Sequence, residues 1–314
     1  MRIILNPDAV APGAFVGTAV TIGVFDGIHR GHAEVIRTLV EVKRLEKRSA
    51  SILLTFDTHP LAVTHPEMVP PLLMTLDEKL HVLGQMDVDC VVVEHFSKET
   101  AAIDFREYIA GRLVGRLGMK HLVVGYDLHL GRGREGSQAR LVEEARRLDF
   151  AVTVVPPVVI QGSVVSSTKI RRDISERRLD HAARCLARPY FFEGEVVRGE
   201  GVGRSIGFPT ANAAVASRAK LLPPGGVYAV EVDAGERRYG GMMNIGSAPT
   251  IHKDGERHVE VHLFDFEGDL VGERIRVHCL QFMREERRFG SIEELRAQLM
   301  HDRVAAYAIL EKKH

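Results

Sequence analysis

The sequence predicts two domains of different class, an α/β domain followed by a β domain. Three observations lead to this prediction. The chain of 314 residues is longer than one average domain. In the first half, apolar β-rich runs alternate with helical patterns, whereas glycine-punctuated alternating runs replace them from about residue 189. We therefore expect an N-terminal doubly wound parallel sheet and a C-terminal antiparallel β-barrel with a final helix.

The strands of the first domain are expected where short apolar runs rich in β-branched residues occur. Helical periodicity fills the segments between them, so strand and helix alternate. The expected strands span 19–25, 51–56, 90–96, 121–126 and 150–155, and the expected helices span 32–48, 76–86, 101–117 and 137–148. This alternation favours a parallel sheet that is covered on both faces and binds ligands at the carboxyl ends of its strands.

The second domain is expected to be a barrel because its runs alternate apolar and polar residues, with no long helix until the end. These runs are FFEGEVVRG, GVYAVEVD, RRYGGMMNI, RHVEVHLFDF and ERIRVHCL. A final helix is expected from Ser291 to about Leu310, because Ser291 and Glu294 form a capping box. Residues 173–188 are expected to be a polar helical connector, which gives domains at 1–172 and 189–314.

Composition excludes several classes of function. Lys and Arg total 42, as do Asp and Glu, so the chain has no basic field for nucleic acid or an anionic membrane. Prolines and a glycine interrupt the uncharged segment 150–168, where we expect a strand, a turn and a second short strand or loop rather than a membrane span. The three cysteines lie far apart and the N-terminus lacks a signal-peptide pattern, which predicts a cytoplasmic protein.

Two imidazoles occur three residues apart in TIGVFDGIHRGH, residues 21–32. The stretch is predicted to be a strand, a tight glycine turn and a helix start. Backbone N–H groups and the positive end of the helix dipole attract anions there, and His29 and His32 add donors, so a phosphate site is indicated. Metal ligation and core packing are the alternatives that the spacing leaves open.

Residues 131–136, GRGREG, match the glycine pattern of a dinucleotide-binding turn. That interpretation requires an acidic residue near the end of the next strand to bind a ribose, and AVTVVPPVV contains none. The two arginines in the loop favour a phosphate-side flap instead.

The second half contains two polar motifs. GEGVGRSIGFPTAN at 199–212 is glycine-rich, and no Walker phosphate loop occurs in the sequence. Thr210 and Asn212 carry the oxygen atoms that Mg²⁺ prefers, although a proline turn with capping side chains has the same composition. In RHVEVHL, a period of two places His258, Glu260 and His262 on one face of a strand, which indicates a solvated face or a zinc site.

Four motifs of the first half together resemble one family. They are GVFDGIHRGH at 23–32, TFDTHP at 55–60, VGYDLHLG at 124–131 and SSTKIR at 166–171. In this order they resemble the nucleotidylyltransferase branch of the bacterial bifunctional riboflavin kinase/FAD synthetases. Residues 199–212 resemble the flavokinase signature of the same family, and GVYAVEV, NIGSAPT and VEVHLFDFEGDLVGERI follow in the family's order.

For the first domain, the resemblance implies a fold of nucleotidylyltransferase type that transfers AMP from ATP to FMN. It implies that His29 and His32 contact the ATP phosphates and that Arg171 binds the leaving pyrophosphate. The implied nucleotide-binding residues are Gly23, Phe25, Asp26, Gly27, Ser167 and Thr168, and the implied flavin-binding residues are Asp57 and Asp127.

For the second domain, the resemblance implies phosphorylation of riboflavin by ATP, with Glu260 as general base and Thr210 and Asn212 as ligands of Mg²⁺. The other implied contacts are Gly201 and Gly203 for the nucleotide and Arg284 and Phe289 for flavin or ATP. The sequence departs from the family pattern at Leu128-His129-Leu130, Ala248 and Val271. These departures bear on affinity rather than on mechanism.

The leading hypothesis is a cytoplasmic enzyme that makes FMN from riboflavin and FAD from FMN, with ATP as the donor. Its expected partners are small-molecule substrates rather than nucleic acid or a membrane, and the sequence leaves its oligomeric state open. One alternative is a flavin-binding or storage protein in which one or both sites are inactive. Another is an adenylyltransferase that acts on a different phosphate acceptor.

Overall fold

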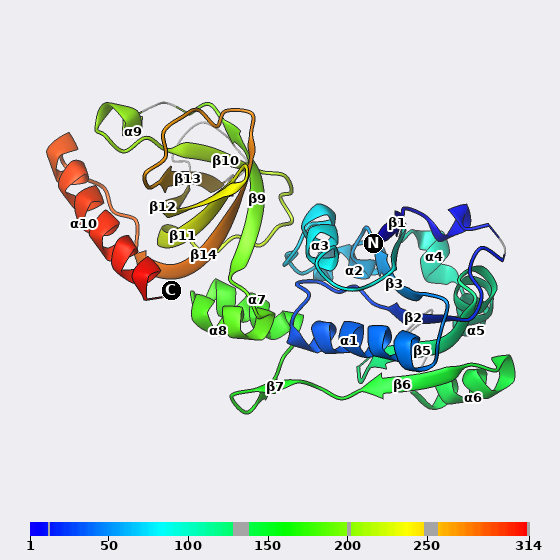
Figure 1. Cartoon of the computed structure of the whole chain (residues 1–314). Coiled ribbons are helices and arrows are strands. Elements are labelled where there is room, and N and C mark those ends of the chain that lie inside the picture. Colours follow the sequence, from blue (N-terminus) through cyan, green and yellow to red (C-terminus); the bar gives the residue numbers. More distant parts are fainter. Residues whose placement is uncertain (12, 128–137, 200–201, 248–256, 313–314) are drawn as a thin grey trace. The chain divides into compact units, whose positions relative to one another are not determined.

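The computed structural model describes residues 1–11, 13–127, 138–199, 202–247 and 257–312 of the chain. The chain divides into two compact units (Figure 1). The first comprises Met1–Pro71 and Leu76–Ser166, and the second comprises Leu72–Thr75 and Ser167–His314. The first unit is α/β and the second is mostly β.

A parallel six-stranded sheet forms the centre of the first unit, in the order β1-β4-β3-β2-β5-β6. The strands are β1 (Arg2–Ile4), β2 (Thr18–Ile22), β3 (Ser51–Phe56), β4 (Cys90–Glu94), β5 (Met119–Gly125) and β6 (Ala151–Val155). The predicted parallel sheet is confirmed, and β1 is an additional edge strand, too short for its pattern to predict. Strands β3 and β4 extend the sheet on one side of β2 and strands β5 and β6 on the other, so the strand order switches between β2 and β5.

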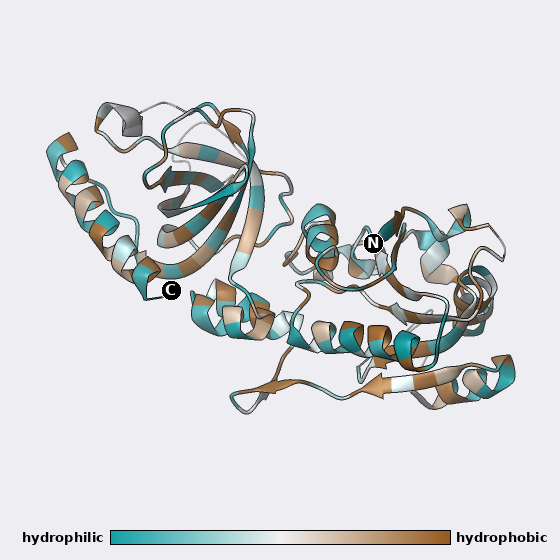
Figure 2. Ribbon diagram, viewed as in Figure 1, coloured by the Kyte–Doolittle hydropathy of each residue, from teal (hydrophilic) through white to brown (hydrophobic). Residues whose placement is uncertain are grey.

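Helices accompany this sheet because the connecting segments carry apolar residues at helical spacing. They are α1 (Arg30–Leu45), α2 (Pro60–Thr64), α3 (Leu76–Leu83), α4 (Lys98–Ala102), α5 (Phe105–Glu107), the π-helix η3 (Tyr108–Arg116) and α6 (Gln138–Leu148), with 3-10 turns η1 (Pro7–Ala9) and η2 (Pro66–Met68). Hydrophobic and hydrophilic residues alternate along α1 (Figure 2), which buries Val35, Ile36 and Leu39. Strands β2, β3 and β4 are buried along their whole length, which explains their continuous apolar runs.

The uncharged segment 150–168 forms β6 and then a two-stranded hairpin of β7 (Val159–Ile160) and β8 (Ser163–Val164). Gln161 and Gly162 have positive φ angles of 49° and 74°, as the tight turn of a hairpin requires. The predicted sequence of strand, turn and second short strand is confirmed. No helix in the described part of the chain is long and apolar enough to cross a membrane.

A closed antiparallel barrel forms most of the second unit, with strands in the order β10-β13-β12-β11-β14-β9. The strands are β9 (Tyr190–Val197), β10 (Ala211–Val215), β11 (Gly226–Ala234), β12 (Arg237–Ser247), β13 (Arg257–Leu263) and β14 (Arg274–Arg284). The predicted barrel is confirmed. Because β10 begins at Ala211, Asn212 is a strand residue rather than part of a proline turn.

The helices of the second unit are α7 (Ser167–Ser175), α8 (Leu179–Leu186), α9 (Val202–Ser205) and α10 (Ile292–Glu311). Ser291 Oγ accepts a hydrogen bond from the Glu294 N–H at 3.2 Å, and Glu294 Oε2 accepts one from the Gly290 N–H at 2.9 Å. The predicted capped final helix is therefore confirmed. Ala306 and Leu310 of α10 pack in an apolar cluster with residues of the barrel.

The short segment Leu72–Thr75 packs in the second unit, although its neighbours in sequence belong to the first. The Leu72 N–H donates to the Ala219 carbonyl at 2.7 Å. Buried Lys220 donates through Nζ to the Leu73 carbonyl, also at 2.7 Å. The second unit therefore includes a piece of chain from the first half of the sequence.

Candidate active sites

The turn after β2 holds the backbone in conformations that most residues avoid. Phe25 and Ile28 have positive φ angles of 50° and 38°, and Gly27 has a φ of 86°. Such conformations cost a non-glycine residue about 1–3 kcal/mol each and cluster at functional sites. The side chains of Phe25 and Ile28 are 3% and 1% exposed, so their packing stabilises the turn. A methyl group at Gly23 would lie 3.2 Å from the Phe25 ring, which shows how closely the turn packs against the strand end.

His29 caps the first turn of α1. Its Nδ1 accepts a hydrogen bond from the backbone N–H of His32 at 3.2 Å. An acceptor nitrogen carries no proton, so the proton of the neutral ring is on Nε2, which is a donor. The two imidazole rings stack with centroids 3.7 Å apart, and the Phe25 ring contacts His32 edge-on at 5.2 Å. The structure thus brings the two predicted imidazoles together at a helix start, and their role as phosphate ligands stays a prediction.

Carboxylates follow neighbouring strands of the sheet. Asp26 follows β2 and is buried, Asp57 follows β3, and Asp127 follows β5. Asp57 Oδ2 pairs with His95 Nδ1 at 2.7 Å, and Asp57 Oδ1 accepts from the Phe96 N–H at 3.3 Å. Burial acts to raise the pKa of Asp57, but the hydrogen bonds, with that from His95 first, lower it more. The hydrogen bond to Asp57 in turn raises the pKa of His95.

Sequence reasoning did not include His95, the partner of Asp57, among the candidate site residues. It follows β4 directly, as Asp57 follows β3, and the Asp57 N–H donates to the Glu94 carbonyl at 3.2 Å. The sequence does contain a signal for His95, because this residue directly follows an apolar run that predicts a strand. The carboxyl ends of parallel strands meet at one edge of the sheet, where ligands bind.

Ser167, Thr168 and Arg171 lie on α7, which groups with the second unit. Their proposed place beside the ATP bound at His29 and His32 therefore stays a prediction. Further predictions concern residues 128–136, Gly201 and Ala248, which lie outside the described residues. Val271, a departure from the family pattern, is 46% exposed in the connection between β13 and β14.

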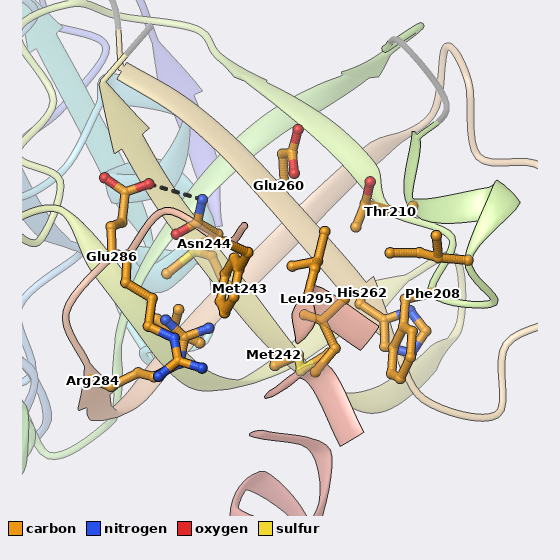
Figure 3. A pocket seen from close by; sticks show the side chains of 16 residues that line it. Phe208, Thr210, Met242, Met243, Asn244, Glu260, His262, Arg284, Glu286 and Leu295 are labelled. Atoms are coloured by element: carbon orange, nitrogen blue, oxygen red, sulfur yellow. Dashed lines mark hydrogen bonds between the residues drawn. The ribbon is translucent and has the colours of Figure 1, made fainter. Parts of the chain in front are cut away.

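The second unit contains a pocket of about 190 Å³ beside strands β12 and β13 and helix α10 (Figure 3). The predicted site residues that line it are Gly203, Thr210, Glu260, Arg284 and Phe289. Its apolar lining includes Ile206, Phe208, Val227, Met242, Met243, Leu295 and Leu299. Apolar walls with a few convergent polar groups are typical of small-molecule sites. The structure therefore brings most of the predicted kinase residues to one cavity.

Glu260 belongs to a row of polar side chains that crosses three strands. It is directly paired with Asn212 on β10 and with Asn244 on β12. Directly paired residues of antiparallel strands share a face of the sheet, with Cβ atoms about 4.5–5.5 Å apart. Asn244 Nδ2 donates to Glu286 Oε1 at 3.1 Å, as the dashed line in Figure 3 shows. The Glu260 carboxylate thus has an amide neighbour on each side, and Asn244 is a site residue that sequence reasoning missed.

Glycines pack directly on the segment that carries the predicted metal ligands. A methyl group at Gly203 would lie 2.3 Å from the Phe208 carbonyl oxygen, and one at Gly199 would lie 2.1 Å from Asn212 Nδ2. Gly203 O also accepts a hydrogen bond from the Phe208 N–H at 2.8 Å. The backbone of each glycine can lie this close to the neighbouring segment only because glycine has no Cβ. The two glycines therefore set the position of Thr210 and Asn212.

His262 is buried, although it shares a strand face with Glu260. Its Nδ1 hydrogen-bonds to the Pro209 carbonyl at 2.8 Å. The ring packs against Phe208 and Phe264, with centroids 5.3 and 5.7 Å away. Burial lowers the pKa of His262 despite the bond to Pro209. A neutral His262 ring therefore anchors the backbone just before Thr210.

The metal interpretations of the imidazoles find no support in the described part of the chain. Potential ligand atoms gather there at Asp173, His181 and Cys185, within 4.8 Å of one another. Asp173 is already paired with Arg178 Nη2 and with His181 Nδ1, each at 2.6 Å, so it acts as a buried ionic anchor between α7 and α8. Two metal sites were considered from the sequence, one at His29 and His32 and one at His258, Glu260 and His262. Neither set forms such a group.

Arg284 lines the pocket, and Asp302 of α10 holds its guanidinium. Arg284 Nε and Nη2 donate to the two carboxylate oxygens of Asp302 at 2.9 and 2.7 Å, and Asp302 is 3% exposed. This bidentate pair fastens the end of β14 to α10. The Phe289 ring centroid lies 5.9 Å from the guanidinium carbon. Arg284 therefore positions one wall of the pocket, and its contact with flavin stays a prediction.

Both units thus carry surfaces suited to phosphorylated ligands. One has a helix start with two stacked imidazoles beside the switch point of a parallel sheet, and the other has a pocket lined by a carboxylate and a threonine hydroxyl. This combination defines a two-domain transferase that uses nucleotides. Models of the FAD synthetase and riboflavin kinase families match residues 13–169 and 186–310. The chain belongs to the family of bifunctional riboflavin kinase/FMN adenylyltransferases.

Curated relatives match nearly the whole chain. The bifunctional riboflavin kinase/FMN adenylyltransferase of Escherichia coli (strain K12) is 38% identical over 307 residues, which cover 98% of this chain and 97% of that protein. The protein of the same name from Bacillus subtilis (strain 168) is 32% identical, over 92% of this chain and 91% of that protein. A crystal structure described as a macrolide-efflux protein from Streptococcus pneumoniae aligns with a TM-score of 0.85 and 29% identity, over 97% of this chain and 98% of that one.

Proposed function

We infer that the chain phosphorylates riboflavin to FMN in the barrel unit and adenylylates FMN to FAD in the α/β unit, with ATP as the donor in both reactions. The observation that carries this inference is the match of two family models to separate halves of the chain, together with curated relatives that cover both. The product of the first reaction is the substrate of the second, which gives the fusion of the two units a rationale.

In the barrel unit, Glu260 is the general base for the 5′-hydroxyl of riboflavin. The hydroxyl oxygen bonds to the γ-phosphorus of ATP, the bond from that phosphorus to the β-phosphate oxygen breaks, and ADP leaves. Support comes from the position of Glu260 on the pocket wall, where apolar side chains suit a flavin ring. Arg284 and Phe289, on the same wall, are the proposed flavin contacts.

Thr210 and Asn212 are the proposed ligands of Mg²⁺. Their donor set fits this ion, because a hydroxyl and an amide carbonyl are hard oxygen ligands and Mg²⁺ completes its shell with phosphates and water. When bound, Mg²⁺ supplies positive charge to the ATP phosphates. The close packing of Gly203 and Gly199 on this segment holds the two side chains in place.

In the α/β unit, a phosphate oxygen of FMN attacks the α-phosphorus of ATP and pyrophosphate leaves. This reaction needs positioned substrates and neutralised charge rather than a protein nucleophile. The start of α1 supplies backbone donors, and His29 adds its Nε2–H. Ser167, Thr168 and Arg171 are further proposed contacts of the phosphates, with Arg171 for the leaving pyrophosphate.

A direct test incubates the purified chain with riboflavin, ATP and Mg²⁺ and separates the flavins by chromatography over time. FMN should appear first and FAD later, and EDTA should stop both reactions. Flavin that stays bound without turnover would instead identify a storage protein. FMN that accumulates without becoming FAD would point to a different acceptor for the α/β unit.

We also propose a cytoplasmic location. Cys90, Cys185 and Cys279 are buried free thiols, which a reducing compartment preserves. Oxidised cysteines in protein isolated from cells, measured by alkylation and mass spectrometry, would contradict this location.

A further inference from the structure

A buried lysine lies beneath the turn that carries the imidazole pair. Lys79 belongs to α3 and is 5% exposed. Its Nζ donates to the Val24 carbonyl at 2.8 Å, to Thr55 Oγ1 at 3.1 Å and to the Phe56 carbonyl at 3.2 Å. An ammonium group has three donors, and three acceptors surround this one. Lys79 is therefore a satisfied buried cation with a defined position.

The three acceptors lie at the carboxyl ends of two neighbouring strands. Val24 directly precedes Phe25, the first residue of the turn with a positive φ angle, and Phe56 directly precedes Asp57. Thr55 Oγ1 also donates to the Val24 carbonyl at 3.2 Å, so the hydroxyl links the strand ends as well. One ammonium group thus ties the end of β2 to the end of β3 at the edge where the sheet binds ligands.

The Lys79 ammonium lies within reach of the electrostatic field of two carboxylates. Burial lowers its pKa to about 8, while the carboxylates of Asp26 and Asp57 act to raise it. The ammonium offsets part of the negative charge of these two carboxylates where two anionic substrates must meet. His95 is paired with Asp57, so it belongs to the same group of charges.

We propose that Lys79 is a positioning residue for adenylyl transfer, which holds the turn at Phe25 to Gly27 and the carboxylate of Asp57 in place for ATP and FMN. It acts through these residues and need not touch either substrate. The proposal rests on the inferred FMN adenylyltransferase activity and adds to it a residue outside the motifs by which the sequence resembles its family.

The test is a single-turnover measurement with enzyme in excess over FMN and with saturating ATP. As long as folded enzyme stays in saturating excess, the rate constant for FAD formation is a property of the active molecules, so a partial loss of folded protein leaves it unchanged. Lys79→Met keeps the length of the side chain and removes the charge. We expect its rate constant to fall by about 100-fold, the size of effect that a misplacement near 1 Å can have.

A matched control is Lys120→Met. Lys120 lies near the amino end of β5, and its Nζ pairs with Asp149 Oδ2 at 2.8 Å on the surface. This variant should keep the wild-type rate constant, and both variants should phosphorylate riboflavin at the wild-type rate. A rate constant for Lys79→Met within twofold of wild type, at any amplitude, would overturn the proposal. Wild-type protein that forms no FAD would refute the proposed function itself.

If Lys79→Met does not fold, the wild-type chain provides the measurement. Its single-turnover rate constant should fall as the pH rises past about 8, because the ammonium loses its proton there. The charged groups that face it are the carboxylates of Asp26 and Asp57. A rate constant that stays flat up to about pH 9.5, well past the pKa of Lys79, would overturn the proposal.

Discussion

Asn212 on β10 and Glu260 on β13 are direct cross-strand partners, so the proposed metal ligand and the proposed base share one face of the barrel sheet. Paired positions of this kind are held by the hydrogen-bonded register of the two strands rather than by loops. The barrel therefore presents the two groups at a fixed separation, which positioned catalysis requires.

Replacement of Glu260 by glutamine should separate the two activities. Glu260→Gln keeps the shape of the side chain and removes its basicity, so FMN formation should fall by about 100-fold or more. Conversion of supplied FMN to FAD should continue at the wild-type rate. Separate assays from riboflavin and from FMN check this outcome, and loss of both reactions in a folded protein would contradict the assignment of Glu260 to the barrel site alone.

A methyl group at Gly203 should impair riboflavin phosphorylation selectively. In Gly203→Ala the new Cβ would meet the Phe208 carbonyl oxygen at 2.3 Å, so the backbone that leads to Thr210 must shift. We expect kcat/KM for riboflavin to fall on the order of 10- to 100-fold. Gly111→Ala adds the same methyl at a helix position where no atom apart from its chain neighbours and its own helix backbone lies within 4 Å, and it should leave riboflavin phosphorylation unchanged. Equal activities in the two variants would show that the close approach is irrelevant.

The two roles of His29 can be separated by two substitutions. Asparagine can accept the hydrogen bond from the His32 N–H that caps α1, whereas alanine cannot. His29→Ala should therefore lose about 1 kcal/mol of unfolding free energy in urea, and His29→Asn should lose less. Both variants should lose most FAD formation, because neither has the imidazole Nε2–H. Wild-type FAD formation by His29→Asn would reduce His29 to a helix cap.

Acid should destabilise the barrel through His262. Burial lowers its pKa in the folded state below the ordinary value of 6.5, so the unfolded chain binds the proton more tightly. The stability from this group is fully present above pH 6.5 and is lost as the pH falls through the lower folded value. Unfolding of the barrel, followed in urea at pH values on either side of this range, should therefore show a lower midpoint on the acid side.

His262→Asn is the matched variant for this measurement. Asparagine can still donate to the Pro209 carbonyl but does not titrate, so its unfolding midpoint should depend less on pH. Some dependence should remain, because burial also lowers the pKa of His278. Identical pH dependence in wild type and variant would exclude His262 as the source.

The parts of the fold that could be predicted are those that depend on local pattern. Strands β2 and β3 are apolar because both faces are buried, and Ser291 with Glu294 marks the start of α10 within a few residues. The place of His29 at a helix start followed in the same way, because strand, turn and helix are adjacent in sequence. In each case the residues that determine the element lie inside it or next to it.

The remaining parts depend on which distant segments become neighbours. Asp302 holds Arg284 across 18 residues, and Lys79 reaches Val24 across 55. The sequence does not distinguish a buried lysine on a helix from a solvent-exposed one. Only the packing of the helix against the sheet shows that Lys79 is buried. The pairing of Asn244 with Glu260 likewise follows from the register of the barrel strands, which no single motif contains.

Because the segment Leu72–Thr75 belongs to the second unit, neither unit is encoded by one continuous segment of the gene. The chain passes between the units at Pro71–Leu72, Thr75–Leu76 and Ser166–Ser167. A barrel expressed from Ser167 onward would lack the Leu73 carbonyl that binds Lys220 and would leave a buried ammonium short of an acceptor. Recombination between relatives at the interdomain boundary would therefore exchange a barrel while keeping another protein's residues 72–75, which constrains how this pair of activities could be separated or shuffled in evolution.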